Sequence, residues 1–530
     1  MLQELGFLTD RRSKRTGRGC IPDASSGSCA SSVRRWRART PVRIRSVPGA
    51  TSPDSSFLRV LCIACDYIPE ALGAQARLVP VESRIDERRL ALIRGGREDC
   101  QVETAKKRLV WTILKDEESY HMSALLIRDV TLVDGTGAPP RSGVSVLVDG
   151  PRIVAIAGPE LVAPPGAAEV HGHGHFLLPG FFDCHVHLMA EGPDLLGQLL
   201  KPPSYLVIGA VERMRRTLDA GVTTVRDLGG ADRGLKMARE EGRITGPRLQ
   251  VAVRILSITG GHGDLTFAGT AATVEPHLME ELVDGDGVLA GVRRVIREGA
   301  DVVKVCTTGG VLSPGDDPQH AHFSPEELSV IAQEARRQGR RLAAHAQGSE
   351  GIKNAVRAGW TSIEHGIFLD QEGIDLMLAA GTFLIPTLVA PRAVLEARER
   401  GLPVPDWAVE KTKRVLEAHQ ENIARAHAAG VRIALGTDAG VGPHGQNLRE
   451  LMLLQEIGLS PMEAIVAGTQ HGAQVMGLEG ELGTIEVGKL ADLILTDVDP
   501  LAHLGALADP DRIRMVIQDG QVVKDLRERR

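Results

Sequence analysis

The feature that most constrains the fold is a repeat between Pro179 and about Leu478, where short apolar runs alternate with helical segments. This alternation is typical of βα units, which build a parallel sheet covered by helices. Eight runs are candidate strands, the number that a (β/α)₈ barrel needs: 181–187, 222–227, 249–255, 302–307, 342–346, 362–365, 383–388 and 433–437. We therefore predict an α/β protein with a TIM barrel over residues 179–478.

Two of the helices in this region carry clear start signals. Ser324-Pro-Glu-Glu327 and Ser460-Pro-Met-Glu463 each place Ser at an N-cap, Pro at the first helical position and Glu three residues after the Ser. Helices are expected to begin directly after both serines.

The segments on either side of this region have a different sequence pattern. Residues 127–156 and the segment from Gly483 onward contain short alternating strands separated by Gly, Asp and Pro turns. We expect 122–178 and 479–530 to form one small discontinuous β-sandwich domain beside the barrel.

Residues 1–121 differ chemically from the rest. They carry 22 Lys and Arg against 15 Asp and Glu, a balance of +7, whereas residues 122–530 carry 40 against 53, a balance of −13. Much of the leader lacks a periodic apolar pattern and is expected to be disordered. Because no methionine lies between Met1 and Met122, we interpret Met122 as the true translation start. An organelle-targeting peptide and a basic nucleic-acid-binding arm are the alternatives. Cys62-Ile-Ala-Cys65 is a lone pair and a weak metal signal.

Bulk properties exclude several classes of protein. With 43% hydrophobic and 25% charged residues, and no apolar run near the roughly 20 residues that span a bilayer, the chain is not an integral membrane protein. The body's negative balance disfavours nucleic acid. Only Cys184 and Cys306 follow residue 122, which indicates a reducing compartment, and we expect the cytoplasm. A small-molecule substrate is expected; self-association into a homo-oligomer is left open.

The sharpest local motif is Phe182-Asp-Cys-His185-Val-His187, at the end of the first predicted barrel strand. Residues two apart on a strand point to the same side, so both imidazoles can share one cation. Two surface histidines are the alternative, but the apolar flanks disfavour it. The nearby run 171–175, His-Gly-His-Gly-His, lies in a glycine-punctuated linker and is not expected to bind metal.

In Asp301-Val-Val-Lys304-Val-Cys306, alternation places Val303 and Val305 on one face and Lys304 on the other. If the valines face the helices, Lys304 points into the barrel, where burial lowers the pKa of its ammonium. The neutral amine can react with carbon dioxide to give a carbamate that bridges two cations. A lysine that snorkels to the rim is the alternative.

Histidine or aspartate closes three further predicted strands, in Ala343-Ala-His345, Ile363-Glu-His365 and Gly436-Thr-Asp438. A single histidine at a strand end is more often structural. Active groups of barrels, however, gather at the carboxyl ends of the strands. The ordered set therefore predicts a metal centre.

Together these motifs resemble the amidohydrolase superfamily over about residues 123–525, and specifically its branch of imidazolonepropionase-like proteins and Xaa-Pro or Xaa-Arg/Lys dipeptidases. The resemblance is carried by PGFFDCHVHL, GVTTVRDLG, ITGGHGD, VVKVCTTGGVLS, AAHAQG, SIEHG, GTDAG and LGTIEVGKLADLILTDVDP. It implies two divalent cations, expected to be Zn²⁺. His185, His187 and Asp438 would bind one, His345 and His365 the other, and N6-carboxylated Lys304 would bridge them.

The resemblance also implies roles in catalysis. Two cations would activate a hydroxide, and Asp438 would orient it, take its proton and pass it to the leaving amine. His262 is expected to help polarise the carbonyl. Arg226 and His444 are candidates for holding a substrate carboxylate. Gln347 departs from the Tyr or His often found at its position in the branch, which puts the contact made there in doubt.

We therefore expect a metal-dependent hydrolase of an amide bond, in a dipeptide or an N-acyl amino acid. A cyclic amidase or imidazolone ring-opening enzyme that uses the same metal centre is the second hypothesis. A non-catalytic scaffold with the same fold is the third, but it would be expected to lack ligands, and all six ligand-type residues are present.

Overall fold

The computed structural model describes residues 124–194, 197–198, 200–264 and 280–527. The chain divides into two units, Met1–Val102 and Glu103–Arg530, and every described residue lies in the second. The predictions for residues 1–121, including the Cys62–Cys65 pair, fall outside the described residues. No helix in the described part of the chain is long and apolar enough to cross a membrane.

Deleting residues 1–121 is expected to leave folding and activity unchanged, because the first described strand starts at Leu125, after the change in charge at Met122. The melting temperature, metal content and turnover of a chain that starts at Met122 should equal those of the full chain. A clear loss of metal or turnover in the shortened chain would show that the leader contributes to the folded enzyme.

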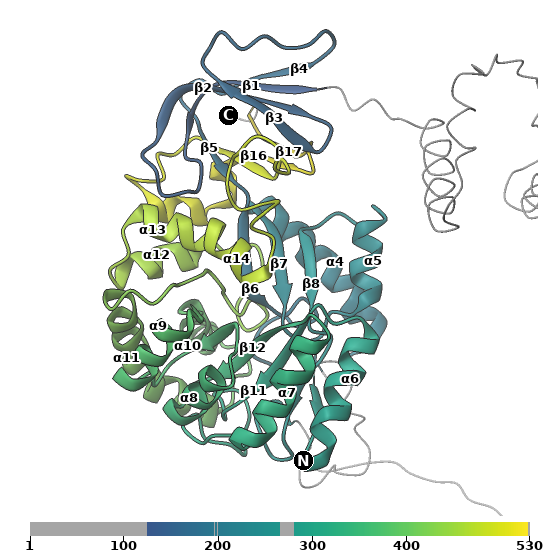
Figure 1. Ribbon diagram of the computed structural model, residues 1–530, viewed down its shortest axis with the longest axis vertical. Helices are drawn as coiled ribbons and strands as arrows, with labels where there is room; N and C mark the ends of the chain where they lie inside the picture. Colours follow the sequence, from purple (N-terminus) through teal and green to yellow (C-terminus); the bar gives the residue numbers. More distant parts are fainter. Residues whose placement is uncertain (1–123, 195–196, 199, 265–279, 528–530) are drawn as a thin grey trace, which may run out of the picture. The chain divides into compact units, whose positions relative to one another are not determined.

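Strands from both ends of the body form one sheet, in the order β17-β16-β15-β5-β1-β2-β3 with β4 beside β1. Blue strands of the early chain and yellow strands of its end lie together in Figure 1. The bounds are β1 (Leu125–Leu132), β2 (Arg141–Asp149), β3 (Arg152–Ala157), β4 (Ala168–His171), β5 (Phe176–Pro179), β15 (Leu493–Thr496), β16 (Ile513–Gln518) and β17 (Gln521–Asp525).

The two ends meet where β5 pairs antiparallel with β15, with Leu177 opposite Leu495. Both leucines are buried in one apolar cluster with Ile127 of β1 and Met515 of β16. The predicted discontinuous β-unit is therefore present as one hydrogen-bonded sheet. The strand pairing joins all eight strands into this one sheet, so it does not show the two separate layers that a β-sandwich has.

The middle of the chain forms two parallel sheets, β6-β7-β8 and β10-β9-β11-β12-β13-β14. Backbone hydrogen bonds also join the two edge strands of the three-stranded sheet to other segments. Asp301 N donates to Val251 O of β8 over 2.8 Å, and Cys184 N of β6 donates to Leu435 O over 2.9 Å. The bounds are β6 (Phe181–Val186), β7 (Val222–Asp227), β8 (Arg248–Val251), β9 (Ile255–Ser257), β10 (Glu280–Leu282), β11 (Val302–Cys306), β12 (Arg341–Ala346), β13 (Ser362–His365) and β14 (Phe383–Ile385).

Two predicted strands differ from the structure. Segment 433–437 forms no regular strand; Ile433 makes only an isolated bridge to Leu384. The segment still bonds the strands on both sides: Ala434 N donates to Leu384 O over 3.0 Å, and Cys184 N donates to Leu435 O over 2.9 Å. The Asp183 carboxylate also accepts the Thr437 backbone N–H at 3.1 Å. Segment 249–255 is broken between β8 and β9, where Val253 has a φ of 67°, outside the β region.

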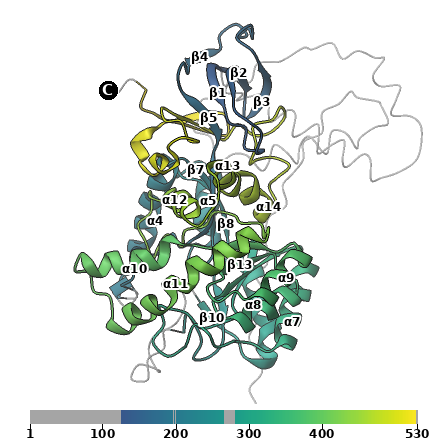
Figure 2. The same ribbon diagram turned by 90° about the vertical axis from the view of Figure 1, so that its left-hand side faces the viewer.

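Both predicted capping boxes are confirmed. Ser324 caps α7 and Ser460 caps α13, each with reciprocal bonds to the Glu three residues later. Helices α7, α8 and α9 lie together along the six-stranded sheet in both views (Figures 1 and 2). The helices are α4 (Pro203–Asp219), α5 (Arg233–Glu240), α6 (Val288–Glu298), α7 (Pro325–Arg337), α8 (Ser349–Arg357), α9 (Gln371–Ala380), α10 (Val389–Glu399), α11 (Asp406–Ala428), α12 (Arg449–Glu456), α13 (Pro461–Val466) and α14 (Gly472–Met476), with a π-helical turn, η4 (Ala467–His471), and 3₁₀ turns η3 (Gly285–Gly287), η5 (Leu504–Ala508) and η6 (Pro510–Arg512).

Candidate active site

Strand alternation places the predicted groups in one cavity. On β11, Val303 and Val305 pack into the main apolar cluster, whereas Lys304 lines the cavity. On β6, Cys184 packs into an apolar cluster, and His185 faces the cavity. The period of two residues per strand explains both orientations.

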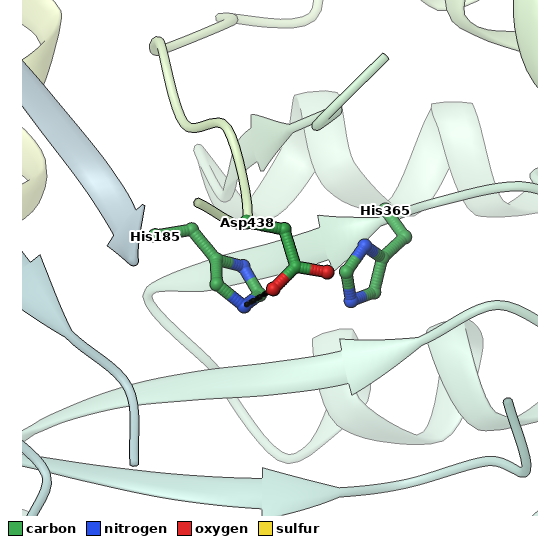
Figure 3. A group of neighbouring side chains, drawn as sticks. All are labelled: His185, His365 and Asp438. Atoms are coloured by element: carbon green, nitrogen blue, oxygen red, sulfur yellow. Dashed lines mark ion pairs between the residues drawn. The ribbon is translucent and has the colours of Figure 1, made fainter. Parts of the chain in front are cut away.

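A cluster of potential metal ligands lies at the base of this cavity. The ligand atoms of His185, His365 and Asp438 all lie within 4.8 Å of one another, and Figure 3 shows the Asp438 carboxylate between the two rings. His187 Nε2 is 3.3 Å from Asp438 Oδ1, and Lys304 Nζ is 3.4 Å from His185 Nε2. His345 lines the same cavity, with its ring centroid 4.6 Å from that of His365. The structure thus brings together all six predicted ligands.

Each histidine of the cluster is anchored through one ring nitrogen. Nδ1 of His185 bonds Glu364 at 3.0 Å, Nδ1 of His187 bonds Gly229 O at 2.9 Å, and Nδ1 of His365 bonds Thr387 at 2.7 Å. For His345 the anchored atom is Nε2, which bonds Gly309 O at 3.1 Å. Metal-binding histidines are oriented in this way, with the second nitrogen left for the metal. The donor set therefore fits a divalent cation.

Unusual backbone angles aim two of these groups. His365 and Asp438 have φ values of 71° and 56°, and Thr387, the partner of His365, has 52°. Such angles are uncommon for residues other than glycine, and they cluster at functional sites. On an extended strand His365 would face away from Glu364, its neighbour. Because the backbone turns at His365, Glu364 can bond His185 while the His365 ring lines the cavity.

Close packing requires glycine beside the histidines. A Cβ on Gly440, whose φ is 126°, would lie 2.8 Å from the His187 Cβ. A side chain there would displace the strand end that carries His187.

Burial sets the charge of the cluster. It lowers the pKa of the Lys304 ammonium, and burial together with neighbouring cations holds the pKa of His185, His345 and His365 well below the usual value. Neutral imidazoles are metal ligands, and a neutral amine is nucleophilic. Burial acts to raise the pKa of Asp438, but its interactions with His185 and His187 outweigh burial and lower that pKa. Burial acts to lower the pKa of His187 as well, but its hydrogen bond and ion pair with Asp438 outweigh burial and raise that pKa. Three histidines, Lys304 and Asp438 thus favour the protonation states that bind a cation, whereas His187 favours its charged form beside Asp438.

A network behind β6 holds Asp438 in place. The buried Asp183 accepts hydrogen bonds from the backbone N–H groups of His185 and Thr437, from the Thr437 hydroxyl, and from Asn447. Burial outweighs these hydrogen bonds and raises the pKa of Asp183 to about 6. Asp183 thereby ties the strand that carries His185 to the loop that carries Asp438.

Two of the other predicted residues line the cavity. His262 stacks on His345 with centroids 4.1 Å apart, and its Nδ1 bonds Ser313 at 2.6 Å and lies 3.3 Å from Asp316. Gln347 is 5% exposed, and its Oε1 has no hydrogen-bond partner within the described chain. Both are available to a bound molecule.

Arg226 and His444 do not line the cavity, which corrects their predicted role as carboxylate-binding residues. Arg226 is 1% exposed, and it donates to Glu364 at 2.9 Å and to Cys184 O at 2.7 Å. His444 is buried and bonds the His187 carbonyl at 3.2 Å. Both residues support histidines of the cluster: Arg226 through Glu364, which bonds His185, and His444 through the His187 carbonyl.

Glu364 is the residue that sequence reasoning missed. Its carboxylate joins Arg226 to the ring of His185, at 2.9 and 3.0 Å. Its place next to His365 is visible in Ile363-Glu-His365, but only the fold shows that it reaches His185, which lies on the other parallel sheet.

The cavity has a volume of about 140 Å³. Apolar side chains form much of the rest of its wall: Val311, Leu312, Ile367, Pro391, Val394, Val415 and Val441. A small molecule with an apolar part matches this lining.

Comparison with known proteins identifies the family. A model of the amidohydrolase family matches residues 176–523, so the chain belongs to the amidohydrolase family. It is accordingly a hydrolase of carbon–nitrogen bonds, in a family that generally uses divalent metal ions. The structural neighbours imply a TIM barrel.

The chain is similar to several named proteins. It is 33% identical to ochratoxinase from Aspergillus niger over 74% of this chain and 85% of that protein. It is 30% identical to imidazolonepropionase from Rhizorhabdus wittichii over 72% and 94%. A solved Xaa-Pro dipeptidase with bound methionine has a TM-score of 0.70 and 33% identity, covering 76% of this chain and all of that one.

Proposed function

We propose that the chain is a two-metal amidohydrolase that cleaves the amide bond of a dipeptide or an N-acyl amino acid. The observation that carries the proposal is the convergence of six ligand-type residues from β6, β11, β12, β13 and the Asp438 loop on one cavity. We further propose that the two parallel sheets and segment 433–437 act as one (β/α)₈ barrel, with these residues at its carboxyl end.

In this proposal His185, His187 and Asp438 would hold one cation, His345 and His365 would hold the second, and Lys304, as an N6-carbamate, would offer anionic oxygens to both. Zn²⁺ is the expected metal because nitrogen-rich donor sets suit it. Bound divalent cations lower the pKa of water and polarise a carbonyl group. A carbamate suits the position of Lys304 because its oxygens are anionic, whereas an ammonium would repel both cations.

The side chains then have distinct tasks. Asp438 accepts a proton from the attacking water and delivers it to the leaving nitrogen. His262, whose Nδ1 faces Ser313 and Asp316, donates a hydrogen bond from Nε2 to the substrate carbonyl oxygen. Gln347 offers its unpaired Oε1 to a substrate N–H group.

The second hypothesis, opening of a cyclic amide, rests on the similarity to imidazolonepropionase. The apolar wall favours the first, because a linear amide with an apolar residue matches Val394, Val415 and Val441 better than a small polar ring does. The two buried free thiols, Cys184 and Cys306, support our proposal of a reducing, cytoplasmic location.

Purified protein is expected to hold close to two divalent ions per chain, and chelation should abolish turnover until metal is returned. Elemental analysis counts the bound ions. Turnover before and after chelation is measured on dipeptides, N-acyl amino acids and imidazolone-type cyclic amides. Full activity in a preparation without metal would contradict the mechanism. Turnover of cyclic amides alone would favour the second hypothesis.

A further inference from the structure

Glu280 lies on the cavity face of β10. In the parallel register Glu280 is opposite Ile255 of β9, and Ile255 is opposite Lys304 of β11. Side chains in one such row point to the same side of a sheet, and all three residues line the cavity. Glu280 therefore shares the face on which Lys304 reaches the ligand cluster.

Among the residues that the structure describes, the buried Glu280 carboxyl has no counter-ion. The residue is 3% exposed, and no Lys, Arg or His of the described chain forms an ion pair with it. Burial first, and then the charge of Asp264, raise its pKa to about 7. A buried carboxylate without a cation is costly, so this end of the cavity favours a ligand that brings a positive charge.

The next residue gives the contrast. Glu281 is partly buried and pairs with two arginines, Arg254 at 3.7 Å and Arg294 at still shorter range. Alternation on β10 puts it on the other face, where protein side chains supply its counter-ions. Among the described residues, arginines neutralise the Glu281 carboxylate, whereas the Glu280 carboxyl lines the cavity and can meet a bound ligand.

We propose that Glu280 determines substrate specificity by binding an ammonium group of the substrate. The inference rests on the proposed function and extends it. Two strand spacings, roughly 10 Å, separate Glu280 from Lys304 in the row, which leaves room for a small amide between the carboxyl and the ligand cluster. With the apolar wall, the favoured substrate class is an amide that carries one ammonium group and one apolar group.

Four substrates locate the ammonium. N-acetyl-Ala-Leu has none, whereas Ala-Leu, N-acetyl-Lys-Leu and N-acetyl-Ala-Lys carry one at the amino terminus, the acyl-side residue or the leaving residue. The metal-loaded wild type should prefer one of these three over N-acetyl-Ala-Leu. Glu280→Gln should lower kcat/KM for the preferred substrate by about 30-fold or more, as loss of a buried charge partner does, and for N-acetyl-Ala-Leu by less than about twofold.

Glu281→Gln is the matched control, since it makes the same change on the opposite face of the same strand. It should affect all four substrates equally. Equal losses for charged and neutral substrates in Glu280→Gln would overturn the inference, as would a wild type that prefers N-acetyl-Ala-Leu.

Binding of a simple amine separates this inference from the proposed function. Calorimetry should show that 2-phenylethylamine binds the metal-loaded wild type and Glu281→Gln better than its N-acetyl derivative does, and that Glu280→Gln loses the difference. If none of the four amides is hydrolysed but this pattern holds, the proposed function fails and the ammonium site stands. If amine binding is unchanged in Glu280→Gln, the ammonium site is wrong, whatever the turnover.

Discussion

Lys304→Arg is expected to lose turnover by on the order of a thousandfold or more, together with bound metal. The residue is 2% exposed, and its Nζ is 3.4 Å from His185 Nε2, inside the group of proposed ligands. A carbamate there would be attracted to two cations. A guanidinium keeps a positive charge, cannot form the carbamate, and would repel both. Elemental analysis and initial rates on the same sample measure the two losses.

Lys304→Ala provides the complementary experiment. It removes the bridge without adding a charge, and short carboxylic acids supplied with metal should restore part of the turnover, since their two oxygens can replace those of the carbamate. Rescue of Lys304→Ala with none for Lys304→Arg would support the bridge. Normal metal content and turnover in Lys304→Arg would refute it.

Asp438→Asn is expected to lower kcat by roughly 10²- to 10⁴-fold, because general acid–base catalysis contributes about that much. The Asn side chain keeps the shape of Asp438 but cannot take up a proton. Asp438 Oδ1 is 3.3 Å from His187 Nε2 and 3.6 Å from His185 Nε2, so it belongs to the proposed ligand cluster. Replacing its carboxylate with a neutral amide should therefore weaken metal binding as well. Rates should therefore be measured at saturating metal, with the bound ions counted.

Asp183→Asn is the matched control, as a second buried aspartate tied to the same loop. Its four hydrogen bonds join His185, Thr437 and Asn447, so its replacement should lower the melting temperature. Because Asp183→Asn keeps the Asp438 carboxylate, it should lower kcat by less than Asp438→Asn does. If Asp183→Asn and Asp438→Asn lose kcat equally at saturating metal, Asp438 has no special part in proton transfer.

Local sequence signals predicted much of the scaffold. The two Ser-Pro-x-Glu motifs began helices because a capping box satisfies backbone N–H groups within four residues. Alternation placed Lys304 opposite Val303 and Val305 because the pleat of a strand has a fixed period. Neither inference needed knowledge of distant contacts.

Segment 433–437 and Arg226 show where such reasoning stops. The apolar run at 433–437 bonds β6 and β14 through its backbone, yet it forms no regular strand, and the Asp183 carboxylate, far away in sequence, also accepts the Thr437 N–H. Arg226 had the charge expected of a carboxylate ligand, yet its partner is the protein's own Glu364. In both cases a side chain from another strand makes a bond that the local sequence does not show.

What the sequence by itself determined is the set of strand ends and the chemical types they carry: four histidines, a lysine and an aspartate at the ends of apolar runs. Only the tertiary structure decided which nitrogen of each histidine is free, because Glu364, Gly229, Gly309 and Thr387 anchor the other one. It also decided that Glu280 faces the cavity while Glu281 meets arginines. The physical reason is range: capping and alternation act within a few residues, whereas burial and hydrogen-bond partners depend on segments that meet only in the folded chain.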